Sequence, residues 1–308
     1  MNNKLIQIPL LVVGGVAVGV LCSFFIMSIK ADTIRTVDVN ADISVEKHAS
    51  SQPYMPEEID FCGERMPIEN IDVYEAIDYE LVVNMYRHSQ TIMYIKRANR
   101  YFPEIEKILK EKNIPDDFKY LCVAESGLSN VVSTAGAAGF WQFMKTTGKE
   151  YGMRIDNDVD ERYDRIISAK AACKYFKTAY SKYKNWTLVA ASYNMGMGGL
   201  SKNLTDQDVT SYYDVLLNAE TARYVYRIVA LKIIMQNPEL YGFHFNDEDL
   251  YTMPETYTVT VDTTIADLTK FAKEHNTSLK VMKYYNPWLR GSALPNQSRK
   301  EYRIELPK

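Results

Sequence analysis

The chain has 308 residues, of which 46% are hydrophobic and 24% are charged, and its formal net charge is -3. This composition is ordinary for a globular protein, and the length suits one medium domain, a smaller one and a tail. A slightly acidic chain without a basic stripe gives nucleic-acid binding no electrostatic support, so we expect no nucleic-acid partner.

The first feature in chain order is an uncharged stretch from Leu5 to Ile29, which lysines flank on both sides. It is long enough to span a bilayer as a helix and longer than the usual core of a signal peptide. No convincing cleavage site follows, and Cys22 lacks the small preceding residue that a lipoprotein cysteine requires. We therefore expect residues 1–30 to form an uncleaved transmembrane anchor, whose orientation the flanking charges leave open.

The pattern then changes twice. Residues 31–65 are polar and unpatterned, which predicts a flexible tether. From 66 to 250 the pattern is mainly helical, with Pro103 opening a new helix and Asn237-Pro238 ending the last one. The predicted helices cover 73–112, 116–126, 139–150, 166–184, 186–195 and 218–236. The span 66–250 is therefore predicted to be a mainly α domain.

Cysteine and histidine usage argues against a metal site. The four cysteines form no CxxC pair, and the four histidines are scattered without ligand spacing. We expect neither metal nor cofactor. Cys122 and Cys173 lie on apolar helical faces and are most simply small buried hydrophobes. A disulfide between them is the alternative in an oxidising compartment.

The helix at 116–126 carries the most informative residue, Glu125. The helix begins after Pro115 with acids in its first turn, and Gly127 marks its C-terminal end. One face is formed by residues spaced i, i+3, i+4 and i+7, namely Phe118, Leu121, Cys122 and Glu125. Burial and the negative end of the helix dipole both favour a protonated carboxyl near neutral pH, as a general acid requires. The alternative is a solvated glutamate at a frayed helix end.

Several ordered motifs between residues 70 and 245 resemble one enzyme family. They are Glu125-Ser126, the run Gly136-Ala137-x-Gly139-Phe140-Trp141-Gln142-Phe143-Met144, and Ala191-Ser192-Tyr193-Asn194-Met195-Gly196. These resemble the signatures of lytic transglycosylases of the goose-lysozyme-like group (glycoside hydrolase family 23). Asp160-Glu161-Arg162-Tyr163-Asp164 and Glu220-Thr221-Ala222-Arg223-Tyr224-Val225 resemble the membrane-bound D branch of lytic murein transglycosylases.

The resemblance implies a lysozyme-like α-helical fold and an activity on peptidoglycan glycan strands. Such enzymes cleave the MurNAc–GlcNAc β-1,4 bond without water and leave a 1,6-anhydro ring on MurNAc. The implied location is the bacterial cell envelope, with the catalytic domain in the periplasm and the N-terminal helix in a membrane. Protein partners are not identified by any of these features.

The chemistry can also be argued from the residues. Most glycosidases need two carboxylates, yet residues 126–155 contain only Glu150. One acid suffices if the nucleophile belongs to the substrate: Glu125 protonates the leaving oxygen, the N-acetyl carbonyl stabilises C1, and Glu125 then removes the C6 hydroxyl proton. The run Asp160-Glu161-Arg162 is better explained as a structural ion-pair network.

The resemblance and the side-chain chemistry assign roles to the loop after Glu125. Ser133 is expected to hydrogen-bond the N-acetyl group, and Gln142 to contact sugar hydroxyls. Gly136 and Gly139 would let the backbone approach the glycan, with a tight turn as the alternative. Met144 would supply an apolar wall.

Two later helices supply the remaining candidates. Tyr193 and Asn194 are expected opposite Glu125, with Asn194 bonding an acetamido or backbone group. The Tyr224 hydroxyl is expected to orient the catalytic carboxyl, and core packing beside Ile228 is the alternative.

The segment 254–308 opens with the alternating strand Tyr257–Val261. A strand–helix–helix–strand order resembles a LysM domain and predicts a small α+β unit. Val261-Asp262-Thr263 stands where Gly-Asp-Thr is usual, so a structural add-on and a glycan-binding module both stay open.

Three functions follow from these features. The favoured one is a membrane-anchored peptidoglycan lyase. The second is a lysozyme-type hydrolase of the same bond, which needs an activating carboxylate and an ordered water. The third is a non-enzymatic glycan-binding scaffold, which the intact Glu125 and its aligned polar groups disfavour.

Overall fold

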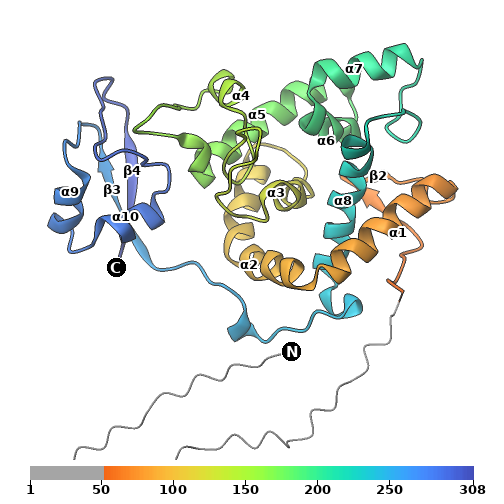
Figure 1. Ribbon diagram of the computed structural model, residues 1–308, viewed down its shortest axis with the longest axis horizontal. Coiled ribbons are helices and arrows are strands. Elements are labelled where there is room, and N and C mark those ends of the chain that lie inside the picture. The colour runs from red at the N-terminus through yellow and green to blue at the C-terminus, as the bar shows by residue number, and fades with distance from the viewer. Residues whose placement is uncertain (1–51) are drawn as a thin grey trace, which may run out of the picture. The chain divides into compact units, whose positions relative to one another are not determined.

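The structure of the protein is a computed structural model that describes residues 52–308 (Figure 1). The predicted anchor at 1–30 and the tether up to residue 51 lie outside the described residues. In the described part, the helical elements precede a small strand-containing unit. The elements are β1 (Asp60–Phe61), β2 (Glu64–Arg65), α1 (Ile71–Tyr86), α2 (His88–Glu111), α3 (Phe118–Ser126), α4 (Lys145–Glu150), η1 (Glu161–Tyr163), α5 (Arg165–Tyr183), α6 (Trp186–Met195), α7 (Met197–Asp206), α8 (Ala219–Gln236), η2 (Pro238–Tyr241), η3 (Asp247–Asp249), β3 (Thr256–Val261), α9 (Leu268–Glu274), α10 (Leu279–Tyr285) and β4 (Tyr302–Pro307).

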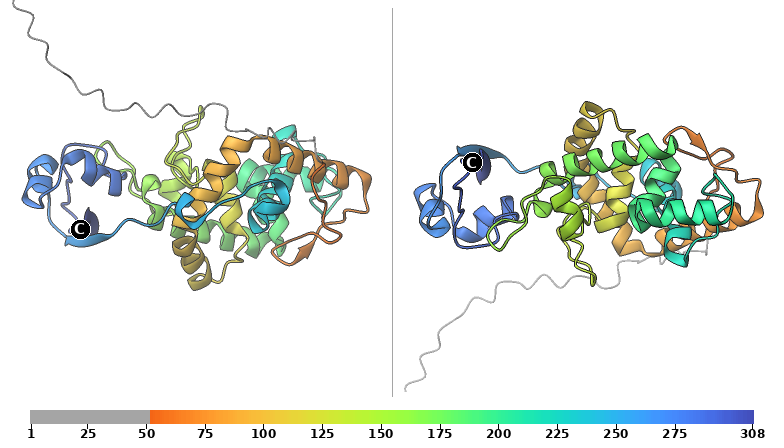
Figure 2. Two further views of the ribbon diagram at one scale, coloured as in Figure 1. Left: turned by 90° about the horizontal axis from the view of Figure 1, so that it is seen from below. Right: turned by 90° about the horizontal axis from the view of Figure 1, so that it is seen from above.

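The short helix α3 lies in the middle of the helical part. Longer helices surround it in Figure 1, and the two further views in Figure 2 agree. Contacts with α8 and α2 are the most extensive that α3 makes with other helices. Its apolar face is fully buried at Phe118, Leu121 and Cys122. A short helix of this kind is stabilised by packing rather than by helix propensity, so the surrounding helices fix where Glu125 lies.

Helix α3 ends as its sequence predicts. Gly127 adopts a left-handed conformation (φ 58°) at the C-cap, and its N–H donates to the Val123 carbonyl. A Cβ at position 127 would come within 2.2 Å of the Tyr94 ring. Glycine is therefore required here for both its backbone angle and its small size.

Three parts of the helical pattern differ from the expectation. Pro103 lies inside α2 instead of opening a new helix, because the apolar side chains on both sides of it are buried and outweigh one lost hydrogen bond. The predicted helix at 139–150 is helical only from Lys145, because Gly139 and Gln142 both have positive φ. Helix α7 was not predicted.

The folded unit also begins earlier than the expected boundary at residue 65. Phe61 and Met66 are fully buried in the same core as α3 and α8. The Lys232 ammonium on α8 binds Asp117, the residue before α3, at 2.8 Å and Asp60 at 3.2 Å. The segment from Ile59 therefore belongs to the helical unit.

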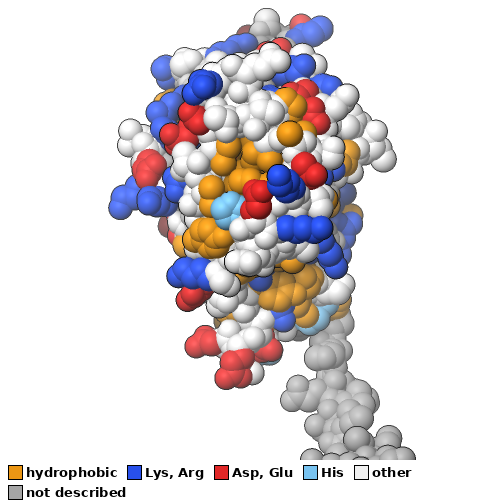
Figure 3. Space-filling view, turned by 90° about the vertical axis from the view of Figure 1, so that its left-hand side faces the viewer, with side chains coloured by type: hydrophobic (Ala, Val, Ile, Leu, Met, Phe, Trp, Pro, Cys, Tyr) orange, Lys and Arg blue, Asp and Glu red, His pale blue; other side chains and the backbone are white. Residues whose placement is uncertain are grey.

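The C-terminal unit has the predicted strand–helix–helix–strand order. Strands β3 and β4 pair antiparallel, from Thr256 opposite Pro307 to Val261 opposite Tyr302, and α9 and α10 lie between them in sequence. Its core is continuous with the segment that precedes α5: Ala138, Val159 and Tyr163 pack in the same cluster as Leu268, Trp288 and Ile304. Figure 3 shows hydrophobic side chains gathered in the middle of the face that this unit presents, among charges of both signs.

Over residues 52–308, none of the helices combines the length and the apolar character needed to cross a bilayer. Within that range, no three His, Cys, Asp or Glu side chains gather in a way that would hold a metal ion. Cys62, Cys122 and Cys173 are free thiols, so the alternative disulfide between Cys122 and Cys173 is not formed.

Candidate active site

The Glu125 carboxyl lies where the last turn of α3 meets α8. The residue is half-buried, and its Oε1 accepts a hydrogen bond from the Tyr224 hydroxyl. Tyr224 is 2% exposed. Its side chain therefore packs in the core and also makes the expected hydrogen bond with Glu125. A rigid, buried hydroxyl on a long helix holds the carboxyl in one orientation.

The surroundings raise the pKa of Glu125 to about 7. Desolvation by burial is the largest cause of this shift, and the negative charge of Glu220 adds to it. The hydrogen bond from Tyr224 and the positive charge of Arg227 act in the opposite direction. A carboxyl with this pKa exchanges its proton near neutral pH and can serve both as an acid and as a base.

Both candidates on α6 are engaged with protein groups, and Tyr193 lies within electrostatic range of Glu125. The Tyr193 hydroxyl donates to the Trp141 carbonyl at 2.7 Å. Burial, followed by the nearby Glu125 charge, raises its pKa well above the usual range. The Asn194 side chain accepts from the Thr221 hydroxyl at 2.7 Å and donates to Glu220 at 3.3 Å. These two residues therefore join α6 to the loop and to the start of α8.

The loop 131–143 is built from short antiparallel bridges, in which Ala138 pairs with both Val132 and Phe143. The exposed Ser133 hydroxyl accepts from the Ala137 N–H at 3.0 Å. The Gln142 amide nitrogen donates to the carbonyls of Val131 and Gly139, at 3.0 and 2.8 Å. Both side chains thus support the loop, and the Gln142 amide oxygen accepts no hydrogen bond from the part of the chain described here.

The two glycines of the loop have different reasons to be glycine. Gly136 has φ 87°, and a Cβ there would meet nothing within 4 Å. Gly139 is buried, with φ 80°, and its Cβ would lie 1.8 Å from the Arg162 carbonyl oxygen. The expected close approach at Gly139 is therefore made by protein backbone, while Gly136 faces open space.

Three side chains of the motif around Gln142 point in different directions. Phe140 and Trp141 are both buried, at 4% and 0% exposure, and pack in the core. Met144 is 44% exposed at the start of α4. The Phe140 carbonyl accepts from the Ser126 hydroxyl at 2.7 Å, which fixes the loop to the residue next to Glu125.

Sequence reasoning missed the loop-holding role of Arg162, although it predicted the ion-pair network. Arg162 forms a nearly buried pair with Asp160 at 2.7 Å, and its Nη1 donates to the carbonyls of Gly136 and Phe143. Nothing in the local pattern signals that this guanidinium reaches a loop about twenty residues earlier.

Two charged groups near Glu125 were also missed, Glu220 and Arg227. Both lie on α8 with Tyr224. The fully buried Glu80 on α1 binds Arg223 at 2.6 Å and lies 3.9 Å from Arg227. The sequence did contain a signal for Glu220 and Arg227. They lie at positions i-4 and i+3 from Tyr224, and those positions share one helix face.

The arrangement as a whole is one proton-exchanging carboxyl, oriented by a buried hydroxyl, beside an exposed loop rich in backbone polar groups. Such a site suits acid–base chemistry on a polar substrate. Residues 102–215, which include Glu125 and the whole loop, match the family described as the transglycosylase SLT domain. Residues 257–308 match the soluble lytic transglycosylase C-terminal LysM-like domain. The chain therefore has one stretch that is similar to a transglycosylase SLT domain and, after it, one that is similar to a LysM-like domain.

The chain is also similar in sequence to individual characterised proteins. It is homologous to the membrane-bound lytic murein transglycosylase D of Escherichia coli (strain K12), with 27% identity over 243 residues, which is 76% of this chain. The protein of the same name from Escherichia coli O6:H1 matches equally. The chain spans about half of the length of these relatives, since the match covers 52% of each.

Proposed function

We propose that this protein is a peptidoglycan lytic transglycosylase. It cleaves the MurNAc–GlcNAc β-1,4 bond without water, leaves 1,6-anhydroMurNAc ends, and acts in cell wall remodelling. The SLT domain and the names of the relatives support this activity. The observation that carries the proposal is the half-buried Glu125, whose pKa of about 7 makes it both acid and base at neutral pH.

The proposed reaction needs one protein carboxyl. Glu125 gives its proton to the glycosidic oxygen as the bond from that oxygen to C1 breaks. The substrate's N-acetyl carbonyl stabilises the positive C1, as in substrate-assisted glycosidases. The C6 hydroxyl oxygen then bonds to C1, and the Glu125 carboxylate takes its proton. The enzyme ends in its starting protonation state.

The other candidates take supporting roles in this proposal. Tyr224 orients the Glu125 carboxyl through its hydrogen bond. Tyr193 and Asn194 hold the loop and α8 in place around the substrate. The exposed Ser133 and Met144 and the half-buried Gln142 remain the proposed contacts of the loop with the glycan. Gly136 leaves room for a sugar beside the backbone.

We further propose a lysozyme-like fold for residues 66–250 and a separate LysM-like unit at 254–308. The central helix α3 with its carboxyl at the C-terminal end, surrounded by longer helices, supports the first assignment. The match of residues 257–308 supports the second.

The uncharged stretch Leu5–Ile29 supports anchoring in a bacterial envelope membrane, with the catalytic domain in the periplasm. Membrane fractionation tests this placement. The full chain should sediment with membranes and dissolve only in detergent, and a chain without residues 1–30 should be released. Release of the full chain by salt alone would contradict the anchor.

Digestion of purified sacculi tests the activity. The full chain should release muropeptides that end in anhydroMurNAc, which mass spectrometry distinguishes from the reducing form by the mass of one water. Glu125→Gln cannot donate or accept the proton, so it should release none while keeping its helical circular dichroism. Full activity in Glu125→Gln would overturn the assignment.

Hydrolysis of the same bond is the second candidate, and the position of Glu220 near Glu125 favours it. Its charge raises the pKa of Glu125, so a second carboxylate lies within electrostatic range. In a hydrolase this carboxylate would activate water. Glu220→Gln would then abolish cleavage, whereas the lytic mechanism predicts that anhydroMurNAc products persist.

A further inference from the structure

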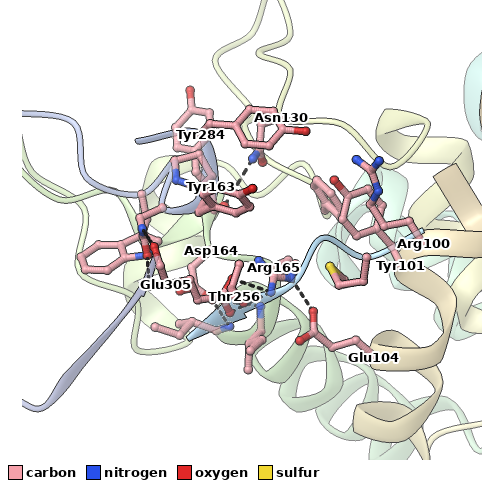
Figure 4. A pocket seen from close by; sticks show the side chains of 18 of the residues that line it. Arg100, Tyr101, Glu104, Asn130, Tyr163, Asp164, Arg165, Thr256, Tyr284 and Glu305 are labelled. Carbon is pink, nitrogen blue, oxygen red and sulfur yellow. Dashed lines mark hydrogen bonds and ion pairs between the residues drawn. The ribbon is translucent and has the colours of Figure 1, made fainter. Parts of the chain in front are cut away.

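A cavity of about 770 Å³ lies between the helical domain and the LysM-like domain, and the reaction proposed above does not use it. Its walls come from α2, the loop after α3, the start of α5, the linker at 251–256 and the C-terminal unit. In Figure 4, Arg100, Tyr101 and Glu104 line one side, and Tyr163, Tyr284 and Glu305 line another. The volume is in the range of sites that bind small molecules or short peptides.

The cavity has an excess of basic groups. Its lining includes six basic side chains and four acidic ones. The basic ones are Arg97, Arg100, Arg165, Lys170, Lys283 and Arg303, and the acidic ones are Glu104, Asp164, Glu301 and Glu305. Two of the acids, Glu104 and Glu305, are both paired with Arg165, at 2.5 and 2.9 Å. Asp164 is the N-cap of α5 and accepts the first N–H groups of that helix.

Two of the remaining cations, Arg100 and Lys283, are held by neutral groups. The Arg100 Nε donates to the Thr252 carbonyl at 2.8 Å, and its guanidinium lies over the rings of Tyr101 and Tyr251. The Lys283 ammonium donates to the Gly291 carbonyl at 2.6 Å. Among the described residues, neither Arg100 nor Lys283 forms an ion pair. A guanidinium fixed in this way presents its remaining N–H groups to a carboxylate.

Aromatic rings complete the lining. Tyr284 is 64% exposed and packs edge-on against Tyr285, with ring centroids 5.3 Å apart. Trp288 and Tyr302 stack at 5.3 Å. Aromatic rings beside cations that have no acidic partner within residues 52–308 suit a ligand with both apolar groups and carboxylates, such as a short acidic peptide.

The cavity also adjoins the candidate active site. Leu128 and Ser129, which line it, follow Glu125 by three and four residues. The Arg97 Nη1, on the cavity wall, donates to the Gly127 carbonyl at the C-cap of α3, at 2.9 Å. A peptide attached to a sugar in the cleft would therefore emerge beside this wall.

From these contacts, and resting on the function proposed above, we propose that the cavity binds the carboxylate-bearing stem peptide of the glycan strand under cleavage. Arg100 pairs with a peptide carboxylate, and Tyr284 covers the apolar part of the peptide. The LysM-like domain thus contributes one wall of a substrate-peptide site.

Direct binding tests the proposal without any cleavage. The probe is the stem peptide that an amidase releases from sacculi, and the protein is the full chain. Titration calorimetry should show saturable binding, which Arg100→Gln weakens about tenfold, as expected for one charge-assisted hydrogen bond. Lys107→Gln removes an exposed charge from the same helix outside the cavity and should bind as the wild type does. Absence of binding, or equal binding by Arg100→Gln, would overturn the proposal.

A second variant guards against misfolding. Because Tyr284 is largely exposed, Tyr284→Ala should leave the fold intact and still weaken binding, while Tyr284→Phe keeps the ring and should bind. If Tyr284→Ala bound the peptide as tightly as the wild type, the LysM-like domain would not contribute to the peptide site.

Kinetics separate this proposal from the proposed function. The wild type should prefer peptide-bearing strands to strands stripped by the amidase, through a lower KM, and Arg100→Gln should lose that preference. Equal KM values for both substrates in the wild type would reject the peptide site and leave the lytic activity standing. Failure to form anhydroMurNAc from either substrate would reject the activity, whatever the peptide titration shows.

Discussion

At the scale of single residues, two opposite charges on α8 shift the pKa of Glu125 in opposite directions. Glu220 raises the pKa of Glu125, and Arg227 lowers it. Because the proposed reaction begins with the protonated carboxyl, activity should be lost as the pH rises through this pKa. The alkaline limb of the pH–rate profile therefore reports the pKa directly.

Substitution of these two charges should move that limb in opposite directions. Arg227→Gln removes a charge that favours the carboxylate, so the limb should move to higher pH. Glu220→Gln should move it to lower pH, because the carboxyl then ionises more readily. The measurement is the initial rate of sacculus solubilisation from pH 5 to 9, a range of about two units on either side of 7. Shifts in the same direction would contradict the electrostatic account.

Ionisation of Glu125 should also lower the free energy of unfolding of the protein. Its pKa rises from 4.5 to about 7 on folding, so the folded state holds the proton more tightly than the unfolded state. The free energy of unfolding must then fall as the pH rises from about 4.5 to 7, by at most about 3 kcal/mol.

Glu125→Gln carries no such titration and should be more stable than the wild type at pH 8, but not at pH 4. Urea unfolding at the two pH values measures the difference. A variant that is less stable than the wild type at pH 8 would show that the ionised carboxyl is well solvated.

At the scale of elements, the loop 131–143 depends on one close backbone contact. Gly139→Ala would place a methyl group 1.8 Å from the Arg162 carbonyl oxygen, and the backbone must move to relieve the clash. We expect a loss of about 3 kcal/mol or more.

Gly136→Ala is the matched control, since it has a similar positive φ but open space around the Cβ. It should cost only the backbone strain, on the order of 1–2 kcal/mol. Urea unfolding compares the two variants. Equal losses would show that the Arg162 contact does not limit position 139.

Local signals predicted α3 well and the loop less well. Pro115 and Gly127 mark the ends of the helix, and the spacing of Phe118, Leu121 and Glu125 identifies its buried face, because each signal lies within a few residues. The loop is held by Arg162, whose contacts cross about twenty residues of sequence. A hydrophobic pattern does not encode such a contact. The backbone that approaches Gly139 and the carbonyl that accepts from Tyr193 were therefore not foreseen.

At the scale of the whole described unit, the helical part and the C-terminal unit are joined by specific contacts that the sequence did not signal. Val159 bridges to Leu289, and the Asp160 N–H donates to the Trp288 carbonyl at 2.9 Å. Lys300 of the C-terminal unit pairs with the fully buried Glu161. The strand–helix–helix–strand order was readable from residues 254–308, but the docking surface combines side chains from both domains.

Arg165 is the clearest test of this coupling. It bridges Glu104 on α2 and Glu305 on β4, and all three side chains are less than a third exposed. Arg165→Ala leaves two carboxylates without a partner and should cost about 2–4 kcal/mol. Thermal unfolding should show the drop, with Lys270→Ala as the control, since that exposed pair at 3.9 Å contributes little. A midpoint unchanged by Arg165→Ala would mean that the domains are held without this bridge.

The most direct test of the single-carboxyl mechanism follows the oxygen atoms. Sacculi are digested in water enriched in heavy oxygen, and the released ends are analysed by mass spectrometry. Attack by the C6 hydroxyl adds no atom from water, so wild-type products should be anhydroMurNAc without the label, and Glu125→Gln should give no products. Reducing ends that carry one heavy oxygen would contradict the account, because they would show that water, and not the substrate's own hydroxyl, attacks C1.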